Sequence, residues 1–267
     1  MKECLNGLYC IHLELTSLCN KDCWMCGRRK IDRDYPEIAM NYGSMDFSLV
    51  EKIARQVPEG IVVQFHNNGD PFLYPRLGDA VRLFGRQIRC LDTNGKLLVE
   101  KASEVINNLD TMTVSVIEND PEADAQYEVV KNFLAIKGDQ KPLMVYRLLG
   151  QVKDPERWEA LGGVIARRIV HNPLGSFGYT RKPTVPEIGM CVEILNHMAI
   201  NRFGKVSACV RFDPHGAGVL GDVNDLSLSE IWNGDKRRQW IDRHKQGKRK
   251  EIPFCSKCDY WGVPTGS

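Results

Sequence analysis

The chain has 267 residues, with a hydrophobic share of 43% and a charged share of 26%, close to the averages of globular proteins. Its net charge of +2 excludes a strongly basic nucleic-acid-binding protein, so no nucleic-acid partner is expected. The sequence has no run of 18 apolar residues and no apolar N-terminal segment of the signal-peptide kind. We therefore expect a soluble, cytoplasmic protein that does not bind a membrane.

Short apolar runs alternate with longer amphipathic ones through the first two thirds of the chain. The predicted strands cover residues 11–15, 61–65, 87–91, 111–117, 141–148 and 167–170. The predicted helices between them cover residues 46–57, 76–84, 97–107, 121–136 and 155–165. This alternation predicts an α/β fold of parallel βα units, as an open partial barrel or a doubly wound sheet. In either case a ligand belongs at the carboxyl ends of the strands.

A Pro- and Gly-rich segment at residues 171–187 interrupts this alternation, and cysteines return from Cys191 onward. We expect two units, residues 1–175 and residues 176–267.

Three cysteines follow the first predicted strand, in the segment SLCNKDCWMCG. Cys19, Cys23 and Cys26 form a C-x3-C-x2-C pattern, and close spacing of this kind suits metal ligation better than a disulfide framework. A [4Fe–4S] cluster usually takes four thiolates, so three would leave one iron open to another ligand. The alternative is a zinc site that a remote Cys or His completes.

The triplet in this first loop resembles that of the radical S-adenosylmethionine (SAM) superfamily. Asn68-Gly69-Asp70-Pro71 stands where that family commonly has Gly-Gly-Glu-Pro, and Thr93-Asn94-Gly95 and Ser115 match its later turns and strands. Met25 takes the place of a common aromatic residue near the adenine. The resemblance implies a partial (β/α)6 barrel with a three-cysteine [4Fe–4S] cluster and SAM. The implied SAM-binding residues are Met25, Asn68, Gly69, Asp70, Asn94 and Ser115.

A second set of four cysteines comprises Cys191, Cys209, Cys255 and Cys258. Residues 201–206 are predicted to form a hairpin that delivers Cys209, and a helix from about residue 226 returns the chain to the last pair. On their chemistry alone, four cysteines suit zinc and an iron–sulfur cluster equally.

The spacing of this second set resembles the SPASM/twitch extension of radical SAM enzymes. The chain ends nine residues after Cys258 without a further cysteine, as in the shorter twitch form. The resemblance implies a small cysteine-rich extension, a β-hairpin plus a helix, that holds a second, auxiliary [4Fe–4S] cluster on four cysteines.

The family resemblance implies an enzyme that cleaves SAM to a 5′-deoxyadenosyl radical with an electron from a donor such as flavodoxin or ferredoxin. The radical would abstract hydrogen from a small-molecule substrate, with the auxiliary cluster as electron acceptor. Arg147, near the end of the fifth predicted strand, and His171, after the sixth, are the candidate catalytic residues that contact substrate.

Two other functions stay open from the sequence. A maturase that modifies a ribosomal peptide or protein side chain is the main alternative. A non-catalytic, metal-bearing interaction module is the other, and it would use the basic segment 236–250. Cys4, Cys10, Cys90 and His66 are expected to be structural.

Overall fold

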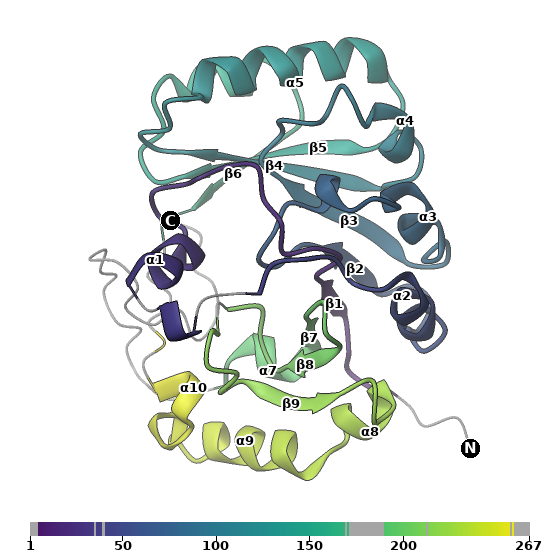
Figure 1. The fold of residues 1–267 in the computed structure, drawn as a ribbon, viewed down its shortest axis with the longest axis vertical. Helices are drawn as coiled ribbons and strands as arrows, with labels where there is room; N and C mark the ends of the chain where they lie inside the picture. Colours follow the sequence, from purple (N-terminus) through teal and green to yellow (C-terminus); the bar gives the residue numbers. More distant parts are fainter. Residues whose placement is uncertain are drawn as a thin grey trace.

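The computed structural model describes residues 5–34, 36–38, 41–168, 170, 190–211, 213–256 and 258. Its strands form one nine-stranded sheet in the order β6-β5-β4-β3-β2-β1-β7-β8-β9 (Figure 1). The strands are β1 Cys10–Leu13, β2 Val62–Phe65, β3 Ile88–Thr93, β4 Thr111–Ile117, β5 Leu143–Leu149, β6 Val164–Arg168, β7 His197–Ile200, β8 Lys205–Ser207 and β9 Val219–Asp222. Strands β1 to β6 pair in parallel, each with the next along the chain, as the alternation of strands and helices predicts.

Helices α2 to α5 follow one another along the outside of this sheet (Figure 1). The described helices are α1 Gly27–Asp34, α2 Phe47–Ala54, α3 Leu77–Arg82, α4 Ala102–Val105, α5 Ala123–Lys137, α6 Pro155–Glu159, α7 Val192–Asn196, α8 Leu228–Trp232, α9 Asp235–Lys245 and α10 Pro253–Ser256. The 3-10 helices in the described part of the chain are η1 Pro36–Ile38, η2 Pro71–Leu73 and η4 Arg249–Glu251. Within the described ranges, no helix has the length and apolar character needed to cross a bilayer.

The two faces of the parallel sheet differ in character. Apolar strand residues such as Ile11, Val63 and Phe65 are fully buried and pack with α2 to α5 in one hydrophobic cluster. Because side chains alternate along a strand, the residues between them point to the opposite, inner face. His12 and Gln64, paired in register on β1 and β2, lie on that inner face. The inner face is therefore polar, and the core lies between the sheet and the helices.

The predicted helix over residues 155–165 is wrong in its second half. The helix ends at Glu159, and residues Val164–Arg168 are strand β6, three residues earlier than predicted. Gly162 and Gly163 both have a positive φ, of 73° and 99°, which ends the helix. A Cβ at Gly163 would also lie 2.7 Å from the Met144 carbonyl oxygen, so only glycine lets β6 approach β5 this closely.

The C-terminal unit is continuous with the sheet. Strand β7 pairs in parallel with β1, and β8 and β9 extend the sheet in antiparallel fashion. The turn between β7 and β8 is the predicted one, with Gly204 at φ 90° and its N–H donating to Asn201 O at 2.9 Å. β1 is thus a central strand, and its otherwise open edge is covered by the extension. The predicted boundary at residues 175 and 176 lies outside the described residues.

Candidate active site

The first cysteine triplet lies in the loop that leaves β1 and enters α1. Cys19, Cys23 and Cys26 are free, half-buried thiols, and the Cys26 N–H donates to Cys23 O at 3.0 Å in a turn. Burial raises the pKa of Cys23 to about 12, and the neighbouring Cys26 and Cys19 thiols act in the same direction. The three sulfurs thus share one small region at the carboxyl end of β1.

Two nitrogen donors approach these sulfurs. Arg28, 3% exposed, brings Nε to 3.4 Å from Cys26 Sγ and donates from Nη1 to Ser17 O at 2.7 Å. Asn94 brings Nδ2 to 3.7 Å from Cys19 Sγ and to 2.8 Å from Asn20 Oδ1. Donors of this kind stabilise thiolates, so the site fits an anionic metal–sulfur group.

The turn after β2 is pressed against the cysteine loop. A Cβ at Gly69 would lie 2.2 Å from Thr16 O and 2.6 Å from Leu18 O, so no other residue fits without moving the backbone. The Asp70 N–H donates to the Leu18 carbonyl at 2.8 Å. Asn68 donates from Nδ2 to the buried Glu14 carboxylate at 2.7 Å. The predicted residues Asn68, Gly69 and Asp70 therefore lie beside the predicted cluster loop.

The Asp70 carboxylate accepts hydrogen bonds from the turn after β3. This carboxylate accepts from Phe72 N at 3.0 Å, Thr93 Oγ1 at 2.9 Å and Asn94 N at 2.8 Å, and the residue is 3% exposed. Asp70 thus ties together the turns after β2 and β3 and sets the position of Asn94. A direct contact between its carboxylate and a SAM amino group stays a prediction.

Arg147 and Ser115 are register partners on β5 and β4, on the inner face of the sheet. The Arg147 guanidinium donates to the Asp92 carboxylate from β3, which also accepts from Gln64 Nε2 at 2.6 Å. Burial opposes ionisation of Asp92, but His66 and Arg147 outweigh it and hold the pKa of this carboxyl below its usual value. The Arg147 guanidinium is thereby fixed on the polar inner face. The predicted adenine contact Met25 lies half-buried in the cysteine loop.

The predicted catalytic residue His171 lies outside the described residues. Sequence reasoning missed Asp92 and His12 and treated His66 as structural. His66 Nε2 lies 2.8 Å from His12 Nδ1, and its Nδ1 lies 3.6 Å from Asp92 Oδ2. Burial lowers the pKa of both rings, to about 3 for His12. Polar residues at alternate positions of consecutive strands were the signal for this inner face.

The second cysteine set lies around a separate hydrophobic cluster. Cys191 precedes α7, Cys209 follows β8, Cys255 lies in α10 and Cys258 follows it. Burial raises the pKa of Cys255 to about 12, with the Cys191 and Cys258 thiols adding to the effect. Burial also raises the pKa of Cys209 well above its usual value, and the Cys191 thiol again contributes. Cys191 thus lies near Cys209 and Cys255, and ligation of one metal group by all four cysteines stays a prediction.

Part of the basic segment 236–250 serves this second site. Arg249, 5% exposed, donates to the carbonyls of Cys255 and, at 3.2 Å, Cys258. Arg237 packs its guanidinium 3.3 Å from the Trp232 ring centroid and donates to Leu195 O at 2.8 Å. These two arginines are buried supports of the fold, and the segment is not a uniformly solvated basic surface.

Comparisons with known proteins agree with this arrangement. Residues 191–259 match the SPASM iron–sulfur cluster-binding domain. The S-adenosyl-L-methionine-dependent 2-deoxy-scyllo-inosamine dehydrogenase of Niallia circulans is 23% identical over 263 residues, 96% of this chain and 94% of that one.

Two solved structures share the fold. BtrN in complex with AdoMet and 2-DOIA has a TM-score of 0.64 at 19% identity, covering 97% of this chain and 95% of that one. Streptococcus suis SuiB bound to the precursor peptide SuiA also has a TM-score of 0.64, at 12% identity, covering 88% of this chain and 67% of that one. Taken together, the cysteine loop after β1, the SPASM match over residues 191–259 and the whole-chain likeness to a SAM-dependent dehydrogenase make this chain similar to radical SAM enzymes with a C-terminal SPASM domain.

Proposed function

We propose that the protein reductively cleaves SAM and uses the 5′-deoxyadenosyl radical to abstract hydrogen from a small-molecule substrate, which it oxidises or rearranges. The observation that carries the proposal is the loop of three free thiols at the end of β1, against which the turns after β2 and β3 are packed. When bound there, a [4Fe–4S] cluster on three thiolates supplies one open iron and the electron for the cleavage.

The chain's own residues would hold and orient these groups. Cys19, Cys23 and Cys26 would ligate the cluster, and Arg28 would offset the negative charge of the thiolates. Asn94 lies close enough to Cys19 to set the loop and to meet SAM beside it. The turn of Asn68, Gly69 and Asp70 would pack against the cysteine loop beside SAM. Asp70 would be a positioning residue for Asn94, whose N–H donates to its carboxylate.

Two further residues complete the proposed SAM site. Ser115 lies on the inner face of β4, where its hydroxyl can meet the ribose. Met25 can pack its polarizable side chain on the adenine ring. Both roles rest on the family resemblance and on their place at this end of the sheet.

Substrate would bind over the polar inner face. The Arg147 side chain is 31% exposed although it is paired with Asp92, so further N–H groups of its planar guanidinium can donate to a substrate hydroxyl, carboxylate or phosphate. Asp92 sets the direction of that guanidinium. His171 is proposed as the second substrate contact, on the family resemblance alone.

The C-terminal set would hold the second cluster. Cys191, Cys209, Cys255 and Cys258 would supply the four thiolates that a fully ligated, twitch-type auxiliary [4Fe–4S] cluster needs, and the SPASM match over this region supports the proposal. The chemistry of such a cluster there is to accept an electron from the substrate. An external donor of the flavodoxin or ferredoxin class would supply the electron for SAM cleavage.

The substrate class can be approached through the relatives. The whole-chain match to the 2-deoxy-scyllo-inosamine dehydrogenase makes 2-deoxy-scyllo-inosamine the first candidate substrate. The SuiB–SuiA structure, with an equal TM-score, keeps peptide modification as the alternative.

The first experiment is anaerobic reconstitution followed by metal counting and a SAM cleavage assay with dithionite. Two clusters correspond to about eight irons per chain. We expect 5′-deoxyadenosine from the wild type and from Cys90→Ala, a control on the inner face of β3, and none from Cys23→Ala. Absence of 5′-deoxyadenosine from the wild type, or its persistence in Cys23→Ala, would overturn the radical assignment. Stoichiometric zinc on the second set would overturn the electron-acceptor role.

A second experiment tests the substrate class. Incubation with 2-deoxy-scyllo-inosamine should give a ketone in a 1:1 ratio to 5′-deoxyadenosine, and Arg147→Lys should raise KM. If 5′-deoxyadenosine forms without any ketone, this substrate is wrong while the radical chemistry stands. Peptide mass changes in a screen of candidate precursor peptides would then favour the maturase.

A further inference from the structure

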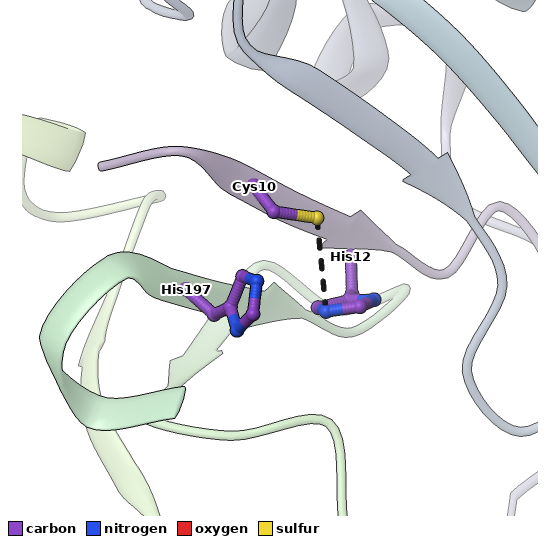
Figure 2. A group of neighbouring side chains, drawn as sticks. All are labelled: Cys10, His12 and His197. Carbon is purple, nitrogen blue, oxygen red and sulfur yellow. Dashed lines mark hydrogen bonds between the residues drawn. The ribbon is translucent and has the colours of Figure 1, made fainter. Parts of the chain in front are cut away.

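Three metal-binding side chains that belong to neither cysteine set meet on the inner face of the sheet. Cys10 and His12 lie on β1, and His197 begins the adjoining strand β7 (Figure 2). Cys10 and His197 are register partners, so their side chains point to the same face. One ligand atom from each of the three lies within 4.8 Å of the others, and Cys10 Sγ is 3.8 Å from His12 Nε2.

We propose that Cys10, His12 and His197 form a third metal site that binds a divalent cation of the zinc class. Zinc takes sulfur at about 2.3 Å and imidazole nitrogen at about 2.0 Å, so a tetrahedral ion holds S and N about 3.5 Å apart. The separation of 3.8 Å between Cys10 and His12 is within a few tenths of an ångström of this value. Binding would thus need only small side-chain movements.

The surroundings of the two histidines are those of metal ligands. A ligating histidine normally engages its other ring nitrogen with a polar partner, which fixes the ring. Nδ1 of His12 is engaged by His66 at 2.8 Å, which leaves Nε2, the nitrogen nearest Cys10, to bind the ion. Nδ1 of His197 lies 3.1 Å from the Glu193 carboxylate, a carboxylate–histidine pair of the kind found behind zinc ligands.

Burial and charge also suit a cation. Cys10 is 8% exposed, while the His197 side chain is 23% exposed and so is in contact with solvent. The carboxylates of Glu193 and Asp92 face the group, and Arg147 on the far side of Asp92 offsets part of their charge. Three protein ligands leave the fourth position of a tetrahedral ion to water.

The place of the site in the fold indicates its effect. Cys10 and His12 lie on the first strand of the parallel sheet, and His197 lies on the first strand of the C-terminal unit. A bound ion would therefore join the two units at β1 and β7, next to the second cysteine set, whose Cys209 lies 4.0 Å from Glu193. This site does not depend on the proposed reaction.

The experiment uses the full chain after anaerobic cluster reconstitution. Zinc is added, the protein is desalted, and iron and zinc are counted beside zinc K-edge X-ray absorption of the same sample. We expect one zinc per chain, with one sulfur and two nitrogen neighbours and no loss of iron. No retained zinc, or zinc with four sulfur neighbours, would overturn the proposal.

Variants locate the ligands. Cys10→Ala, His12→Ala and His197→Gln should each lower the zinc content to background without lowering iron. Cys90→Ala, a free cysteine on the same face, should retain zinc, and loss of zinc there would contradict the ligand set. Because the absorption measurement needs only the wild type, a variant that fails to fold leaves the test intact. 5′-Deoxyadenosine formation measured on the same samples separates failure of this site from failure of the proposed reaction.

Discussion

The two cysteine sites are built by opposite means. The N-terminal triplet is held by polar contacts: Arg28 from α1 and Asn94 from the turn after β3 approach its sulfurs, and the turn at Gly69 packs against its loop. Of the C-terminal four, Cys191, Cys209 and Cys255 pack against an apolar cluster that includes Trp240 and Phe254. The first set thus has polar surroundings, whereas three cysteines of the second set have apolar surroundings.

The difference agrees with the two roles. A cluster that must bind a polar small molecule needs an open position and donors around it, whereas a cluster that only exchanges electrons can be fully ligated and enclosed. The polar inner face with Asp92 and Arg147 lies on the same sheet as the first site, while α7 and β7 lead from it to the second. We therefore predict that a variant that loses the cluster at one site keeps the cluster at the other.

We expect the largest effect from two variants, each of which removes one cysteine ligand from one of the two sites. Cys23→Ala should lower iron by about four per chain and reduce 5′-deoxyadenosine to background, since two thiolates do not hold a cubane. Cys255→Ala should lose a similar amount of iron but still cleave SAM, with substrate oxidation lost. Loss of SAM cleavage in Cys255→Ala would show that the sites are not independent.

The next effect concerns the buried ion pair that fixes the N-terminal loop. Lys21 lies between Cys19 and Cys23 and pairs with Asp120 after β4, and both side chains are 4% exposed. Lys21→Met leaves a buried carboxylate without its partner, so we expect a loss of about 3–5 kcal/mol in the free energy of unfolding. The double variant Lys21→Met/Asp120→Leu should recover part of that loss in urea titrations. Equal stability of wild type and Lys21→Met would mean that the pair is open to solvent.

Gly69→Ala tests the close approach of the turn after β2. Its Cβ would lie 2.2 Å from Thr16 O, so the backbone must move at a cost of about 1–3 kcal/mol. SAM affinity should fall as Asn94 shifts, which equilibrium dialysis of the reconstituted protein can measure. Gly85→Ala is the matched control, because the nearest atom to its Cβ is Arg82 O at an ordinary 3.5 Å. A similar change in both variants would contradict the role assigned to Gly69.

The sequence predicted the elements that carry strong local signals. The order and parallel pairing of the six strands and the β7–β8 turn at Gly204 agree with the pattern, although β6 begins three residues earlier than predicted. These features depend on alternation, glycine or fixed spacing, which a single sequence shows directly. The double glycine at 162 and 163 carried a similar signal for the end of α6 but was overlooked in favour of an amphipathic run.

Long-range pairing was beyond the sequence. Nothing local to His197–Ile200 indicates that this strand covers the open edge of β1, about 185 residues earlier in the chain. The partners of Asp70 are another example, because its motif suggested a ligand while its carboxylate is engaged by Thr93 and Asn94. Asp92 was not predicted as a site residue, because its role is to accept a hydrogen bond from Arg147, which lies 55 residues later in the chain.

The smallest expected effect tests how the C-terminal pair is held. Arg249 donates to two carbonyls of the Cys255–Cys258 turn, and a lysine keeps the charge but not the fork of donors. Arg249→Lys should therefore weaken retention of the second cluster about tenfold, the low end for a residue that supports metal ligands. Iron release to a chelator, followed by the loss of one of two cluster signals in electron paramagnetic resonance, measures this. Arg243→Lys is the control, since its ion pair with Glu251 is exposed and does not touch a cysteine. If Arg249→Lys instead lost the cluster at Cys19, Cys23 and Cys26, the independence of the two sites would be wrong, and the shared strand pair β1–β7 would be the element that couples them.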